Sequence, residues 1–216
     1  MPLFNFADSL RIGSRTVAQT RKGAARTFPM WNEATGGTVT TVANYNGTGE
    51  IWKVHTFTTN QNMVILNASN PFRVLVQGGG AGWGVFWSPG GTGSGGGSGG
   101  TDERASFTTT PGTYAVVVGG RGHNGGYQVF GGAGGTSSIF GISATGGTTN
   151  GNYPMSNILR GTPPGGAPTG GLTSDITGSS YGYAGAYGGS NYGAGSTWSP
   201  HGGGAQGVVI VSYRIA

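Results

Sequence analysis

Cysteine is absent from this chain, so neither disulfides nor thiolate metal sites are available to it. Charged side chains are scarce: they make up 8% of the 216 residues, with 11 Lys or Arg against 6 Asp or Glu. No segment approaches the roughly 20 apolar residues that span a bilayer, so we expect no membrane insertion. Met1–Leu10 lacks the basic and apolar regions of a signal peptide, which predicts synthesis in a cytoplasm and function without secretion.

Patterns that carry catalysis or cofactor binding are missing as well. A phosphate-binding Gly-Lys-Ser/Thr loop is absent, and no glycine run opens the helix that a dinucleotide fingerprint needs. The histidines His55, His123 and His201 are far apart and have no acidic neighbours at metal-site spacing. Asp102 and Glu103 are the one close carboxylate pair, and adjacent strand residues point to opposite faces. We therefore expect a protein that is not an enzyme and holds no cofactor or metal.

Glycine is what the chain has in excess: 49 Gly and 10 Pro together make about 27% of its residues, a share typical of low complexity or disorder. A collagen is excluded because its glycines would have to occupy every third position. Five Trp, nine Tyr and nine Phe are too many for a chain that buries nothing. The composition predicts an ordered protein, with disorder kept as the alternative for residues 148–180.

Helix signals are nearly absent, and short β-branched runs alternate with turn residues. This pattern predicts an all-β fold, a β-sandwich or jelly-roll-like arrangement with essentially no helix. The Pro111-Gly112 turn predicts a hairpin between its flanking runs, and the most apolar run, Val208–Val211, is placed in the centre of a sheet. The expected strands are 38–43, 52–58, 63–66, 72–77, 104–109, 113–118, 137–140, 142–145 and 208–211.

Three glycine tracts, 78–100, 119–135 and 146–204, separate these strands, and glycine recurs at every third position in parts of each. Three residues per turn is the period of a polyproline-II-type helix, which has no internal hydrogen bonds. Buried backbone groups must find partners, and an array of such helices would supply them. We expect ordered, polyglycine-II-like tracts that strands bracket; flexible loops are the alternative.

The basic residues gather at the N-terminus. Five of the 11 lie in the first 26 positions, which carry a net charge of +4 after Asp8 is subtracted. We expect an extended arm or small hairpin over residues 1–35 and a nearly neutral glycine-rich β domain over 36–216. The arm could dock on a protein neighbour or touch nucleic acid, the second being the less favoured. Its candidate anchoring residues are Arg11, Arg15, Arg21, Lys22, Arg26, Phe28 and Trp31.

Large aromatic side chains stand within the glycine tracts, and two interpretations apply to them. For most, we expect packing that fills the gaps between thin glycine layers. Those at loop tips could instead form a surface that stacks on sugars or on another protein. The candidate receptor-facing residues are Trp83, Phe86, Trp87, Tyr181, Tyr183, Tyr187, Tyr192 and Trp198.

Six segments form an ordered series along the chain: His55–Thr58, Arg73–Gly80, Thr110–Gly119, Gly134–Gly141, Ala144–Gly147 and Gly207–Tyr213. Taken in this order, they resemble the glycine-rich domain of bacteriophage tail and tail-fibre proteins. More loosely, Ile12–Val17 is similar to short repeats that open minor tail proteins of actinobacterial phages.

The resemblance implies a structural virion protein, a minor component of the tail tip or fibre that takes part in host attachment. It further implies a homo-oligomer, with a trimer favoured, and other tail proteins as partners. The arm would be the anchor, and a host cell-surface glycan or protein would be the target of the loops. Two alternatives remain: a capsid decoration or head-fibre protein, and a Gly/Tyr-rich nucleic-acid-binding or self-associating protein.

Overall fold

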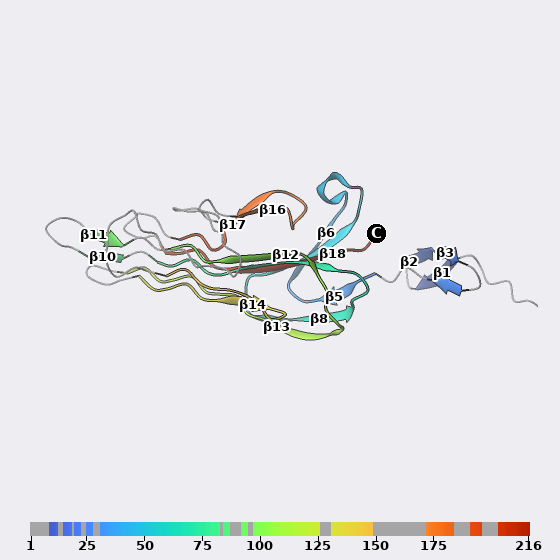
Figure 1. Ribbon diagram of the computed structural model, residues 1–216, viewed down its shortest axis with the longest axis horizontal. Helices are drawn as coiled ribbons and strands as arrows, with labels where there is room; N and C mark the ends of the chain where they lie inside the picture. The colour runs from blue at the N-terminus through green and yellow to red at the C-terminus, as the bar shows by residue number, and fades with distance from the viewer. Residues whose placement is uncertain are drawn as a thin grey trace, which may run out of the picture.

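The computed structural model describes residues 31–82, 97–125, 131–148, 172–183, 191–195 and 203–216, together with the backbone of short strands outside these ranges. The all-β prediction is confirmed: the regular structure of the described chain is antiparallel sheet, and its one helical element is the short 3-10 turn η1 (Tyr45–Gly47) (Figure 1). The jelly-roll arrangement stays a prediction. Among the described residues, no helix has the length and apolar character needed to cross a membrane.

A five-stranded antiparallel sheet is the centre of the fold, with the strand order β12-β9-β18-β7-β6. The last strand along the chain lies in the middle, as predicted for Val208–Val211, because its side chains are apolar on both faces. The strands are β6 (Thr38–Val42), β7 (Trp52–Phe57), β9 (Phe72–Gln77), β12 (Thr101–Phe107) and β18 (Val208–Arg214).

A second sheet of three strands packs against one face of the first; it contains β5 (Glu33–Thr35), β8 (Gln61–Asn67) and β13 (Gly112–Val116), in the order β13-β8-β5. The predicted hairpin around Pro111-Gly112 is wrong. β12 pairs with β9 and β13 pairs with β8, so the turn carries the chain from one sheet to the other. β5, which precedes the expected boundary after residue 35, pairs with β8 in this sheet.

Two apolar clusters cover the two faces of the large sheet. Alternate residues of β18 divide between them: Val209, Val211 and Tyr213 contribute to the core shared with the small sheet, whereas Val208 and Ile210 face the other way. On that second face the chain from Leu172 to Tyr183 supplies the covering side chains, including the buried Tyr183. Burial of both faces explains why β18 reads as a continuous apolar run.

Short hairpins complete the strand inventory. The two strands expected at 137–140 and 142–145 pair with each other as the hairpin β14–β15, and Phe140 at its turn, with φ +54°, stacks on Phe107 of the large sheet. The paired strands are β1 (Ser9–Ile12) with β2 (Arg15–Ala18), β3 (Thr20–Lys22) with β4 (Ala25–Thr27), β10 (Gly84–Phe86) with β11 (Thr92–Ser94), β14 (Ser137–Ile139) with β15 (Ile142–Ala144), and β16 (Leu172–Ser174) with β17 (Tyr181–Tyr183).

Beyond the sheets, segments of the glycine tracts lie side by side, and we call this region the glycine bundle (Figure 1). It consists of residues 78–82, 97–100, 119–123, 132–135, 145–148, 193–195 and 203–207. Segment 78–82, the continuation of β9, runs through its middle and donates its backbone N–H groups outward at 2.8–2.9 Å. The donor–acceptor pairs in chain order are Gly78 to Gly100, Gly79 to Gly135, Gly80 to Ala205, Ala81 to Gly97 and Gly82 to Gly132.

These bonds reach three neighbouring segments in turn and return to the first one at the fourth residue. That repeat is what a backbone with three residues per turn produces. Three further segments lie against Gly78, Gly79 and Gly80 on the sides where these hydrogen bonds do not run. A Cβ added at any of the three glycines would lie within 3.0 Å of a backbone carbonyl oxygen of one of these segments. The middle segment therefore has six neighbours, and only glycine permits backbones to approach so closely.

The segment 172–183 is fastened to the large sheet by polar side chains as well as by apolar ones. Arg73 of β9 donates to Glu103 on β12 at 3.0 Å and to Asp175 at 2.5 Å. Tyr45 of the β6–β7 connection receives a third hydrogen bond from this guanidinium and donates to the carbonyl oxygen of Ile176. The arginine thus joins two neighbouring strands to the segment that covers them.

Candidate functional site at the far end of the glycine bundle

The far end of the glycine bundle, away from the sheets, is where several chain connections begin and end. Ala81 donates to Gly97, and Gly132 donates to His123, so each pair of stems is side by side. The described stems that reach this end belong to residues 78–82, 97–100, 119–125, 131–135, 193–195 and 203–207. Side chains that stand here are therefore held by a hydrogen-bonded backbone framework, which is how rigid scaffolds position binding residues.

In residues 119–124, glycines occupy the positions that face the bundle and side chains occupy positions that face outward. Gly119 and Gly122 face inward, where an added Cβ would collide with the carbonyl oxygens of residues 135 and 132. Arg121 and Asn124, again three residues apart, are exposed. With three residues per turn, one column of the segment must be glycine and the others are free to hold side chains. Arg121 and Asn124 consequently lie on one side of the segment.

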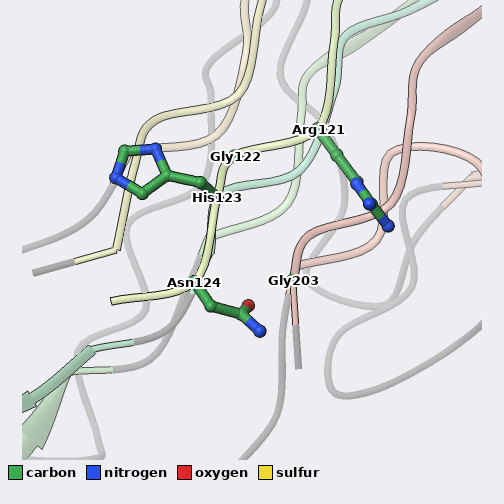
Figure 2. A pocket seen from close by; sticks show the side chains of 5 residues that line it. All are labelled: Arg121, Gly122, His123, Asn124 and Gly203. Atoms are coloured by element: carbon green, nitrogen blue, oxygen red, sulfur yellow. The ribbon is translucent and has the colours of Figure 1, made fainter. Parts of the chain in front are cut away.

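A hollow of about 320 Å³ lies where this segment faces the one that contains Gly203. Its lining residues are Arg121, Gly122, His123, Asn124 and Gly203. Figure 2 shows the side chains of Arg121 and Asn124 on the side toward Gly203, and the imidazole of His123 on the opposite side of the segment. An added Cβ at residue 203 would lie 3.2 Å from Oδ1 of Asn124, so the glycine keeps this wall open.

The volume is at the lower end of the range of small-ligand pockets, about 300–1,000 Å³. The polar groups around it are a guanidinium and a carboxamide, which offer hydrogen-bond donors and one side-chain carbonyl acceptor. This combination can bind polar groups; it contains no nucleophile paired with a base.

The tyrosines predicted to face a receptor separate into different environments. Tyr181 is 37% exposed and donates to Asn191 at 3.3 Å, and the ring of the half-buried Tyr192 lies 6.4 Å from its own. For Tyr183 the expectation is wrong: this side chain is 2% exposed and packs in the second apolar cluster. Burial also raises the pKa of its hydroxyl. The packing interpretation holds for this residue.

The other predicted receptor-facing residues are not described with side chains. Phe86 belongs to β10, whose backbone is described. Trp83, Trp87, Tyr187 and Trp198 lie outside the described residues.

Most of the candidate anchoring residues lie on the short hairpins that precede the body, and their backbone is described. Arg11 is in β1, Arg15 in β2, Arg21 and Lys22 in β3, and Arg26 in β4. Phe28 lies outside the described residues.

Trp31 stands at the point where the arm meets the body. Its ring lies 5.6 Å from the guanidinium carbon of Arg214, which also pairs with Glu50 at 2.8 Å. The side chain thus contacts the end of the central strand and is still 37% exposed. The hydrogen bond from Ile51 to Ala216 at 2.8 Å places the C-terminus at the same end of the molecule.

Buried His55 is the one histidine inside the body among the described residues. One ring nitrogen lies 2.8 Å from the carbonyl oxygen of Gly36 and the other 3.2 Å from the hydroxyl of Tyr213, which accepts the N–H of Ala34. Burial lowers the pKa of His55 below its ordinary value of 6.5. This network ties β5 to the central strand. The described part of the chain holds no group of three or more metal-ligating His, Cys, Asp or Glu side chains.

Arg121 and Asn124 are candidate site residues that are not among those predicted from the sequence. The signal was available, because both occupy one column of a tract whose glycines at 119, 122 and 125 fill another. Comparison with protein-family models and with curated protein sequences finds no match for this chain.

Proposed function

We propose that this protein is a structural component of a bacteriophage virion, a minor tail protein that projects its glycine bundle toward the host. Its arm docks on other tail proteins, and the connections at the far end of the bundle meet a glycan or protein of the cell surface. The proposal rests on the resemblance of the ordered segments over residues 55–216 to glycine-rich domains of phage tail proteins.

The layout of the chain carries this proposal. The arm root at Trp31 and the C-terminus near Ile51 lie together at one end of an elongated body. The glycine bundle extends the sheets in the opposite direction (Figure 1). A molecule that attaches by one end and presents chain connections at the other has the polarity that an attachment protein needs.

The charge distribution agrees with a docking role for the arm. Five basic side chains lie in the first 26 residues, whereas the rest of the chain carries a net charge of +1. An acidic neighbour in the particle would attract the arm without attracting the body. Assembly as a homotrimer would add subunit contacts that offset the entropy lost when so many glycines become ordered.

Imaging of purified particles tests the proposal. Virions that carry this chain with a C-terminal epitope tag would be labelled with gold-conjugated antibody, and we expect the label at the tail. Label on the head would favour the alternative of a capsid decoration or head-fibre protein. Particles that lack the chain altogether would overturn a structural role in the virion.

An arm variant tests the anchoring step separately. Replacement of Arg11, Arg15 and Arg21 by Gln should reduce incorporation into particles and leave the thermal unfolding of the purified full-length protein unchanged. Replacement of the body lysine Lys53 by Gln, which also removes positive charge, should not affect incorporation. Equal incorporation of the arm variant and the unaltered protein would show that the basic arm is not the anchor.

A further inference from the structure

Among the described residues, Arg121 is the cation of the glycine bundle that forms no ion pair. The ion pairs of the described residues use Arg73, Arg104 and Arg214, and none of them involves Arg121. A partner elsewhere in the tracts is excluded by the sequence, because residues 104–174 and 176–216 contain no Asp or Glu. Asp175 is the single carboxylate between residue 103 and the C-terminus, and it is paired with Arg73.

The absence of acidic residues gives this end of the molecule a defined electrostatic preference. An anion that enters the hollow meets one guanidinium and no like charge from residues 104–174 or 176–216. Guanidinium groups bind carboxylate and phosphate oxygens with two parallel hydrogen bonds. Such charge-assisted, bidentate pairs are among the strongest hydrogen bonds that side chains form at neutral pH. The first requirement for selecting an oxyanion is therefore present.

The remaining lining groups suit the hydroxyl-rich part of such a ligand. The carboxamide of Asn124 offers both donors and an acceptor, which is what adjacent sugar hydroxyls require. It lies one turn beyond Arg121, about 9 Å along the segment at 3.1 Å per residue, a separation that a single sugar ring with its substituents can bridge. The bare backbone at Gly203 leaves the opposite wall open.

We infer that the hollow between Arg121, Asn124 and Gly203 is a binding subsite for an anionic sugar, with the guanidinium on a carboxylate or phosphate and the carboxamide on neighbouring hydroxyls (Figure 2). The inference deepens the proposed attachment function and rests on it, because it names the class of surface polymer recognised: an acidic glycan.

Titration of the full-length, isotopically labelled protein tests the subsite. The probes are sodium glucuronate, glucose 6-phosphate and neutral glucose, and the readout is the backbone amide signal of Gly122 and of Gly203. We expect saturable shifts with an anionic sugar and none with glucose at the same concentration. Shifts with glucuronate alone identify a uronic-acid polymer, and shifts with the phosphate alone identify a phosphorylated one. Absence of shifts with both anions, or equal shifts with glucose, overturns the subsite.

Two variants and a matched control make the test specific to the geometry. Arg121→Gln should weaken binding roughly ten- to hundredfold, the loss expected for a charge-assisted hydrogen bond. Gly203→Val keeps the arginine and fills the hollow, so it should weaken binding as well. Lys53→Gln removes the same charge on β7 of the large sheet, and its affinity should be unchanged. If Lys53→Gln weakened binding of the anionic sugar as much as Arg121→Gln does, the loss of affinity would come from net charge alone, and the subsite would be overturned.

Adsorption to host cells distinguishes failure of the subsite from failure of the proposed function. If Arg121→Gln protein, shown to be folded by its thermal unfolding, adsorbs to cells as the unaltered chain does, the subsite is refuted and the attachment role stands. If anionic sugars bind as expected but the chain is missing from virions, the subsite stands and the proposed function is refuted.

Discussion

Replacement of Gly80 by alanine should destabilise the protein more than any conservative change on its surface. Gly80 lies in the middle segment of the glycine bundle, where an alanine Cβ would be placed 1.9 Å from the carbonyl oxygen of Ala194. Real Cβ atoms do not come within 3.0 Å of such a neighbour, so one backbone segment must move by about 1 Å. Overpacking of this kind costs about 1–3 kcal/mol.

The displacement also disturbs the hydrogen bonds on either side. Gly80 donates to Ala205 and accepts from Gly122, both at 2.8 Å, and each bond contributes about 0.5–1.5 kcal/mol. Together with the overpacking, we expect a loss of about 3 kcal/mol. For a chain of this size, 1 kcal/mol shifts the melting temperature by about 2–4 °C, which gives a decrease of about 6–12 °C in calorimetry.

Gly120→Ala is the matched control for this prediction. Gly120 is exposed, nothing lies within 4 Å of an added Cβ, and its φ is outside the left-handed region. The substitution should leave the native state intact and raise stability by about 0.4–1 kcal/mol, because alanine restricts the unfolded chain. Equal melting temperatures for Gly80→Ala and the unaltered protein would refute the close-packed bundle.

Two further substitutions probe the sheets. Arg73→Met should lower the free energy of unfolding by about 2–4 kcal/mol, because it leaves the carboxylates of Glu103 and Asp175 unpaired beside the sheet. Urea denaturation measures this loss, and an unchanged unfolding midpoint would show that the ion pairs contribute nothing to stability. Because burial lowers the pKa of His55, the unfolded chain binds a proton at a higher pH than the folded one. The free energy of unfolding should therefore fall as the pH is lowered from about 8 to about 5, and His55→Gln should flatten this dependence; equal slopes for the two proteins would contradict the assignment.

Local sequence determined where most strands of the two larger sheets lie, but it did not predict β5, β10, β11, β16 or β17. β-branched runs bounded by turn residues lie where the strands are, and the apolar run Val208–Val211 is central because a strand buried on both faces has no polar face to alternate with. The strands on either side of Phe140 and Gly141 could likewise be predicted from local sequence, whereas their pairing as a hairpin is a finding of the structure.

Partner choice between strands depended on the tertiary structure. The turn at Pro111 looks like that of a hairpin, yet β12 and β13 pair with strands that lie far from them in sequence. Turn chemistry fixes only the reversal of the chain. The sheet that each strand joins depends on which faces can be buried together, and Tyr183 was misassigned for the same reason, since its covering partners Val54 and Leu75 are distant in the sequence.

The amino-acid pattern alone indicates an all-β chain whose basic residues gather in the first 26 positions, with glycine at every third position in parts of its tracts. Which tract lies beside which depends on the three-dimensional packing, because the tracts are locally alike and their hydrogen bonds join residues far apart in the chain. The same long-range packing decided that Gly122 faces inward while Arg121 and Asn124 face an open hollow. A period of three predicts columns of side chains; the neighbours in space determine which column must be glycine.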